Sequence, residues 1–351
     1  MGRSRPAPPF LSVSGPQLAA ATAAGPGPAG RAGDADVDAS AHVVIATATN
    51  PARSRLLPGE TTPTSLSVVR FGVPSTGSFG IVRVHVISDM EGVAGIVKWE
   101  QTTGGEKLYE EGRRLYTEEI NAAVRGARAA GATEIVVMDC HGAGGPWMFN
   151  SLVPELLDSG CEYVVQERWT QYTAFLEEGC DAALFIGMHA MAGTPDGVMN
   201  HTVSGTDWRS LRFNGREVGE TGINAALCGT WGCPVLLVTG DRATCAEAKA
   251  LLGDGLTTVG VKTGIGRFGA RQVTPARARE LIEGTARATL ARPTAVAPYD
   301  PGRPCEIEVE LSATEGVERY RHRSGVEVMD PRRIVSRADD WWAAWRQFFL
   351  A

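Results

Sequence analysis

The 351-residue sequence lacks long apolar runs, a block of basic residues and any Cys-x-x-Cys pair. No uninterrupted apolar stretch approaches the roughly 20 residues that span a bilayer, so we expect no membrane partner. The net charge of −6 and the absence of a Lys/Arg cluster argue against a nucleic-acid partner. The seven scattered cysteines fit neither a disulfide framework nor a zinc ribbon, which favours a reducing, cytoplasmic location.

Residues 1–80 differ in composition from the rest of the chain. They are rich in Ala, Pro, Gly, Ser and Thr, contain no Lys, and show no sustained period of 2 or 3.6 residues. Such a segment cannot bury enough apolar surface to offset the entropy of ordering it, so we expect disorder or an over-extended reading frame. Prolines interrupt its apolar stretches, which argues against a secretory signal. The folded protein is predicted to begin near Ile81.

From Ile81 onward, buried strands alternate with amphipathic helices, and this alternation is typical of an α/β fold. Residues 81–298 are therefore predicted to form a catalytic domain with a mostly parallel central sheet flanked by helices, a three-layer αβα arrangement. Asn214-Gly215 predicts a hairpin over 210–218, and Thr274-Pro275 predicts a helix start. The expected strands lie near 82–88, 134–139, 163–165, 182–188, 234–239 and 256–261. The expected helices lie near 106–130, 171–179, 220–231 and 243–252.

Residues 299–351 are predicted to form a smaller C-terminal α+β portion, which follows the proline-rich stretch 293–304. Ser336-x-x-Asp339 resembles a helix start, and the terminal helix then carries an unusually aromatic face. We expect that face to pack on the core or on a subunit neighbour. Strands are expected near 305–312 and 325–329.

Candidate metal ligands follow the ends of the predicted strands. The apolar run 84–88 ends in Asp89-Met90-Glu91-Gly92. Because residues i and i+2 of an extended segment point the same way, the two carboxylates leave the strand side by side. Such a pair repels unless a proton or a cation lies between the two groups. A divalent metal site and a solvated loop both fit this motif taken alone.

His141 and His189 also follow strand ends, and the carboxyl ends of parallel strands share one edge of a sheet. Two imidazoles with two or three carboxylates suit zinc or another borderline divalent ion. Taken singly, each histidine also fits an ordinary loop or core position. Glu220 alone fits an acidic residue in the first turn of a helix, and His201 alone fits a loop histidine.

Six separated segments of residues 81–351 resemble, in the same order, zinc-dependent D-aminopeptidases of the DppA type, peptidase family M55. Residues 1–80 take no part in the resemblance. A chance match of six motifs in one order is remote. The matching segments are Ser88–Gly92, Tyr109–Arg113 with Thr117–Glu119, Asp139–His141, Gly187–Ala190, Thr194–His201 and Val218–Ala225.

The resemblance implies two zinc ions per subunit, with Asp89 bridging them. Glu91, His141, His189 and Glu220 would complete the ligand set, and His201 would match the family's catalytic histidine. Two local departures stand out. Asp196 is a one-residue insertion before Gly197 that could shift the loop carrying His201. Cys140 stands where a serine also occurs, and we assign it no role.

The implied function is that of an exopeptidase. It would remove the N-terminal D-residue from short, D-Ala-D-Ala-like peptides with a hydroxide activated by two zinc ions, within a ring-like homo-oligomer. The alternatives are a dizinc amidase acting on another small amide and a peptide- or metal-binding module without turnover. Asp139 has two expected roles: it orients the His141 ring, or it caps the turn after its strand.

Overall fold

The computed structural model describes residues 82–349. The predictions for residues 1–80 therefore lie outside the described residues. Among the described residues, no helix is both long and apolar enough to cross a membrane.

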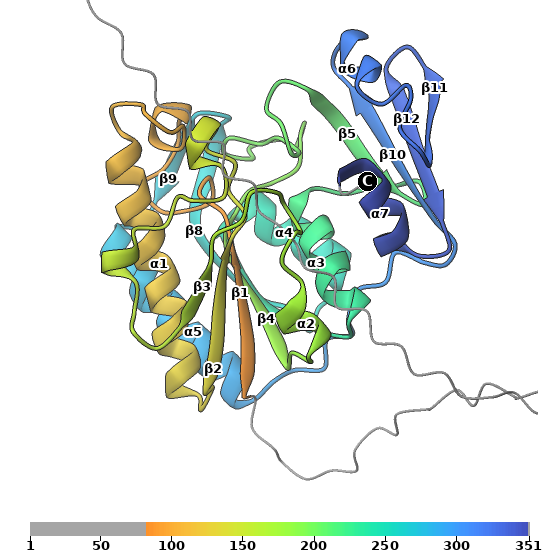
Figure 1. The fold of residues 1–351 in the computed structure, drawn as a ribbon. Coiled ribbons are helices and arrows are strands. Elements are labelled where there is room, and N and C mark those ends of the chain that lie inside the picture. The colour runs from red at the N-terminus through yellow and green to blue at the C-terminus, as the bar shows by residue number, and fades with distance from the viewer. Residues whose placement is uncertain (1–81, 350–351) are drawn as a thin grey trace, which may run out of the picture. The chain divides into compact units, whose positions relative to one another are not determined.

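The central sheet has seven strands in the order β3-β2-β1-β4-β7-β8-β9 (Figure 1). All neighbouring strands are parallel except β8 and β9, so the predicted mostly parallel sheet is confirmed. The chain builds outward from β1 through β2 to β3 and then returns to place β4 on the other side of β1. Open α/β sheets bind their ligands at such a reversal. The strands are β1 (Arg83–Ser88), β2 (Glu134–Asp139), β3 (Glu162–Val164), β4 (Ala182–Met188), β7 (Val235–Asp241), β8 (Thr257–Gly266) and β9 (Gly269–Gln272).

Helices cover both faces of this sheet, as predicted. The side chains of Val84 and Val86 pack in one apolar core with α1 (Tyr109–Ala129) and α5 (Pro275–Ala291). Ile87 points to the opposite face, in a second core with α3 (Glu220–Thr230) and α4 (Arg242–Leu252). This division follows from the two-residue alternation of side chains along a strand. Short 3₁₀ turns occur at Trp99–Gln101, Gly145–Trp147 and Pro154–Leu156.

Local signals placed the start of α5 correctly but overestimated the length of α2. The Thr274 side chain accepts a hydrogen bond from the Arg277 N–H at the start of α5, as its position before Pro275 predicts. The helix expected over 171–179 is reduced to α2 (Ala174–Glu177). Thr170 and Gly179 both take positive φ, at 61° and 102°, and the chain leaves the helical conformation on either side of α2.

A second, antiparallel sheet has the order β11-β12-β10-β5-β6. The predicted hairpin is confirmed: Asn214 and Gly215 connect β5 to β6 with φ of 46° and 80°. Strand β10 pairs with β5, so the end of the chain completes a sheet that its middle begins. The domain boundary between residues 298 and 299 stays a prediction. The strands are β5 (Trp208–Phe213), β6 (Arg216–Glu217), β10 (Cys305–Leu311), β11 (Val326–Asp330) and β12 (Arg333–Ala338).

The helix start expected at Ser336-x-x-Asp339 is wrong, because Ser336 lies inside β12. Its buried hydroxyl donates to the Ala344 carbonyl instead of capping a helix. Helix α7 (Trp341–Phe349) begins after Asp340, whose carboxylate accepts the Ala343 N–H. A short α6 (Glu315–Glu318) precedes β11. The aromatic side chains of α7 that point into the core of this chain are those of Trp341, Trp345 and Phe348.

Candidate metal centre

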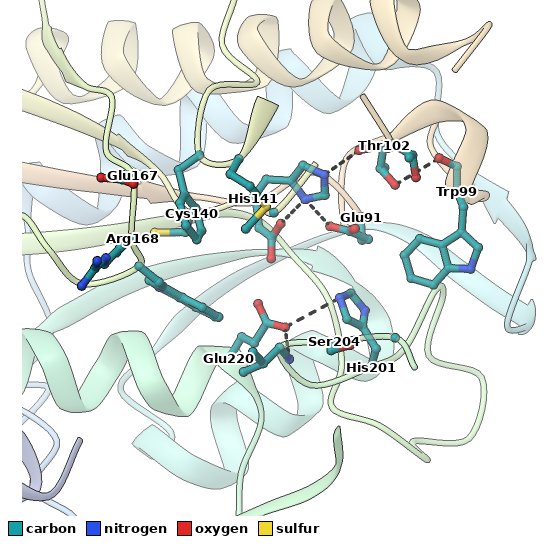
Figure 2. A pocket seen from close by; sticks show the side chains of 18 residues that line it. Glu91, Trp99, Thr102, Cys140, His141, Glu167, Arg168, His201, Ser204 and Glu220 are labelled. Carbon is teal, nitrogen blue, oxygen red and sulfur yellow. Dashed lines mark hydrogen bonds and ion pairs between the residues drawn. The ribbon is translucent and has the colours of Figure 1, made fainter. Parts of the chain in front are cut away.

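The structure brings the six predicted site residues together at the carboxyl edge of the central sheet. Asp89 and Glu91 follow β1, His141 follows β2 and His189 follows β4. Glu220 is the first residue of α3, and His201 lies in the loop between β4 and β5. Figure 2 shows His141 with Glu91 on one side of the pocket and His201 with Glu220 on the other.

The side chains form two trios, in each of which the potential ligand atoms lie within 4.8 Å of one another. In the first trio, Asp89–Glu91–His141, the His141 Nδ1 lies 3.0 Å from Asp89 Oδ1 and 3.1 Å from Glu91 Oε2. The second trio is His189–His201–Glu220, in which His189 Nε2 lies 3.2 Å from Glu220 Oε1. His189 Nε2 is also 3.4 Å from Asp89 Oδ2. Asp89 therefore faces both trios, with one oxygen toward each.

The donor set fits a divalent cation. Asp89, Glu91, His141, His189 and Glu220 are each at most 4% exposed. Glu91 Oε2 and His189 Nε2 are buried without a hydrogen-bond partner, although both lie near other members of the cluster. A buried polar atom left unpaired costs free energy, and nitrogen and carboxylate oxygen donors are the ligands that zinc takes. A metal ion would therefore satisfy the atoms that the protein leaves unpaired.

The ring of His141 is oriented by a backbone carbonyl. Its Nε2 donates to the Thr102 oxygen at 2.8 Å, which leaves Nδ1 turned toward the carboxylates. Asp139 does not contact the ring: its carboxylate accepts hydrogen bonds from the His141 N–H, the Ser151 N–H and the Tyr116 hydroxyl. Of its two expected roles, the structure therefore shows the cap of the turn. Sequence reasoning missed Thr102, because a backbone carbonyl leaves no residue-type signal.

The cluster attracts positive charge. Burial alone would raise the pKa of Asp89, but the adjacent imidazoles of His141 and His189 hold it well below its usual range. Burial would lower the pKa of both of these imidazoles, and the surrounding carboxylates instead raise it well above the usual value. The buried carboxylates therefore create a strongly negative environment, which favours a cation between them.

His201 lies against His189 and Glu220, so the loop that contains Asp196 does not carry it away from the cluster. Its ring stacks on that of His189, with centroids 4.0 Å apart and planes 10° from parallel. Its Nδ1 donates to the Met199 carbonyl at 2.8 Å, and its Nε2 lies 3.7 Å from Glu220 Oε1. The edge of Trp99 closes the other side at 5.3 Å. Burial and the neighbouring His189 lower the pKa of His201, which favours the neutral ring.

This fold agrees with the comparisons to known proteins. A family model described as D-aminopeptidase, peptidase family M55, matches residues 82–350. The chain belongs to peptidase family M55. A D-aminopeptidase of Bacillus subtilis (strain 168) is 32% identical to it over 249 residues, which cover 70% of this chain and 88% of the relative.

A solved structure, described as the Zn-dependent D-aminopeptidase DppA from Bacillus subtilis, a self-compartmentalizing protease, has the same fold. It superimposes with a TM-score of 0.68 at 30% identity and covers 76% of this chain and 94% of that one. The resemblance drawn from the six sequence segments is thereby confirmed.

In this M55 member, a buried lysine supports the loop that carries Glu91. The Lys262 ammonium donates to the carbonyls of Glu91, Val93 and Ile96 at 2.5, 2.9 and 2.6 Å. The side-chain carboxylate of Glu119 accepts the Ala94 N–H of the same loop. Burial lowers the pKa of Lys262 to about 8. Sequence reasoning missed Lys262, because a single lysine in a strand gives no sign of the loop it reaches.

Two glycines let the ends of β1 and β4 approach closely. The Gly92 N–H donates to the Gly187 carbonyl at 2.8 Å, and a Cβ on Gly92 would lie 2.0 Å from the Met188 oxygen. Gly187 has φ of 73°, and a Cβ there would lie 2.1 Å from the Asp89 oxygen. Larger residues would push the two strand ends apart and, with them, Asp89 and His189.

The candidate metal centre opens into a cavity of about 450 Å³, called the metal cavity below. This volume lies within the range of about 300–1,000 Å³ that small-molecule sites occupy. Apolar and aromatic groups form much of its wall beside the polar cluster, as in most small-molecule sites. The principal ones are Trp99, Met148, Phe149, Trp169 and Val203.

Proposed function

We propose that this M55 member is a zinc-dependent D-aminopeptidase that holds two zinc ions per subunit. It removes the N-terminal D-residue from short, D-Ala-D-Ala-like peptides. The observation that carries the proposal is the position of Asp89, whose two oxygens face two different groups of ligand atoms. The relatives, a D-aminopeptidase and a structure described as Zn-dependent, support the choice of metal and reaction.

Five side chains would hold the metal pair. Asp89 Oδ1, Glu91 and His141 Nδ1 would bind one ion, while Asp89 Oδ2, His189 Nε2 and Glu220 would bind the other. When bound, such a pair supplies a water of lowered pKa and an electrophile for the scissile carbonyl. The three carboxylates offset much of the added charge. The carbonyls of Thr102 and Ala190, which accept from the remaining ring nitrogens of His141 and His189, fix the imidazoles for this task.

His201 is the proposed acid–base group. Its Nδ1 is tied to the Met199 carbonyl, so its Nε2 faces the cavity as the nitrogen free to exchange a proton. It accepts a proton from the attacking water and returns it to the leaving amine, or it stabilises the developing oxyanion. Stacking on His189 holds the His201 ring beside the proposed metal ligands His189 and Glu220, and His201 is not itself one of the five proposed ligands.

The same relatives support a proposed oligomer, and the cysteines support a proposed cytoplasmic location. The related structure is described as self-compartmentalizing, which supports a ring-like homo-oligomer for this chain. All seven cysteines are free thiols, in keeping with the reducing cytoplasm. Light scattering of the purified full chain tests the oligomer, and a monomer at working concentration would contradict it.

A zinc titration paired with a substrate panel tests the function. The chelator-treated protein is titrated with zinc while metal content and hydrolysis of D- and L-alanyl p-nitroanilides are measured. We expect two zinc equivalents and hydrolysis of the D-substrate alone. One equivalent at full activity would overturn the two-zinc proposal. Hydrolysis of the L-substrate, or of another amide only, would favour the amidase alternative, and metal binding without any hydrolysis would favour a binding module.

A further inference from the structure

A second groove meets the metal cavity at His201. It has a volume of about 440 Å³ and shares His201 and Gly205 with the metal cavity. Its wall is polar and comes from the loop after β4, from β5 and from the tip of the β8–β9 hairpin. A peptide whose scissile bond lies beside His201 can therefore extend its leaving portion into this groove.

The groove carries three arginines, and two of them are already paired with carboxylates. Arg209 lies 3.8 Å from Glu310, and Arg212 lies 3.0 Å from Glu308. The third is Arg267, and within residues 82–349 no ion pair joins its guanidinium to a carboxylate. Arg267 is thus the arginine of the groove whose charge is available to a ligand.

Aromatic rings hold Arg267 in a defined place. Its guanidinium carbon lies 5.8 Å from the ring centre of Trp99 and 5.3 Å from that of Phe268, which are cation–π distances. Trp99 lines the metal cavity and touches the His201 ring. The Arg267 carbonyl also accepts the Met199 N–H at 2.6 Å, in the loop that carries His201. The cation is therefore fixed relative to the proposed acid–base group.

We propose that Arg267 binds the C-terminal carboxylate of the peptide substrate, which makes this enzyme selective for short peptides with a free carboxyl end. The inference rests on the proposed function, because it places the scissile bond at His201. In a dipeptide, the carboxylate lies about one residue step, 3.8 Å, beyond the scissile carbonyl. A guanidinium pairs with a carboxylate through two parallel hydrogen bonds, and an amide offers no such charge.

The test compares D-Ala-D-Ala with its C-terminal amide. The kcat/KM of each peptide is measured on zinc-loaded wild type, Arg267→Gln and Arg267→Lys. We expect wild type to prefer the free acid by about 10- to 100-fold, the range of a hydrogen bond to a charged group. Arg267→Gln removes this preference, mainly through KM for the acid, and leaves the amide within about twofold of wild type. Arg267→Lys keeps part of the preference for the free acid, because lysine retains the positive charge but cannot form the two parallel hydrogen bonds.

The matched control is Arg209→Gln, since Arg209 lines the same groove but pairs with Glu310. It should keep the wild-type preference. Equal losses on both peptides in Arg267→Gln, or no preference in wild type, would overturn the proposal. Calorimetric binding of the two peptides separates the two hypotheses. If neither peptide is hydrolysed, the proposed function fails, and an acid-over-amide binding preference that requires Arg267 would still support the carboxylate subsite.

Discussion

The two trios around Asp89 are built differently. The first trio stands directly after β1 and β2 and is at most 4% exposed, and Thr102 and Lys262 anchor it through backbone carbonyls. In the second trio, His189 follows β4 and Glu220 begins α3, but His201 lies in the irregular loop before β5, where Met199 and Val203 take positive φ of 53° and 62°. A β-branched residue in that conformation is strained. Regular elements therefore position every member of the two trios except His201, which loop contacts hold in place.

Asp89→Ala should have the largest effect, because it removes the group that both trios share. We expect zinc content and hydrolysis to be lost together, with kcat/KM reduced by at least about 10⁴-fold, since both ions lose a charged ligand. Metal analysis and turnover of D-alanyl p-nitroanilide measure this. Asp181→Ala, at the opposite edge of the sheet, serves as the control. Full zinc occupancy in Asp89→Ala would refute the bridging role.

His201→Ala should separate metal binding from turnover. The five proposed ligands remain, so both zinc ions should stay bound, while kcat falls by about 10²–10⁴ and KM changes little. Metal analysis and steady-state kinetics decide the outcome, with exposed His322→Ala as the control. Loss of one zinc equivalent would make His201 a ligand of the second trio. An unchanged kcat would remove it from the reaction.

Lys262→Met tests whether the first trio depends on its supporting loop. Three carbonyls lose their donor, so the ion at Glu91 should bind about 10- to 100-fold more weakly, as when other outer contacts of metal ligands are removed. The second ion should keep its affinity, and excess zinc should restore kcat. Competition titration against a chelator measures both affinities, with surface Lys249→Met as the control. Equal weakening of both ions would contradict a local effect.

Trp99→Leu should have the smallest effect, confined to the second trio. Loss of the edge contact with His201 leaves the ring less well held, and an aromatic pair of this kind is worth a factor of about 2–10. D-Alanyl p-nitroanilide isolates this effect, because it has no C-terminal carboxylate for Arg267. We expect a reduced kcat with unchanged zinc content, and Trp231→Leu controls for loss of an indole elsewhere. A fall in zinc content would show that Trp99 supports the ligands themselves.

The same contrast explains what the sequence could predict. Asp89, Glu91, His141 and His189 could be placed because each follows a buried strand, and parallel strands end at one edge. Glu220 and His201 came into the site only through the resemblance, since a first-turn acid and a loop histidine have no pattern of their own. Lys262 donates to backbone carbonyls, and Thr102 acts through its own backbone carbonyl. Because every residue has such a carbonyl, neither role could be recognised from the sequence.

The second sheet was harder to predict, because its strands are distant in the sequence. The hairpin was recognisable from Asn214-Gly215, a local signal. The pairing of β5 with β10 could not be recognised from the sequence, because pairing between strands far apart in the chain depends on the whole surface that they bury. Strand β12 was missed for a related reason. The local sequence at Ser336 matches a helix cap, whereas in the folded chain the Ser336 hydroxyl donates to the Ala344 carbonyl.

The packing of α7 has a consequence for how the protein is made. This last helix packs on α3, whose first residue is Glu220, and Trp345 donates a hydrogen bond to Thr170 beside the cavity. The ribosome synthesises α7 after the strands that lead to Asp89, His141 and His189. The strand ends of the candidate site can therefore form before α7 is available to pack on α3. A chain cut before Trp341 would keep those strand ends but lose the helix that packs on α3.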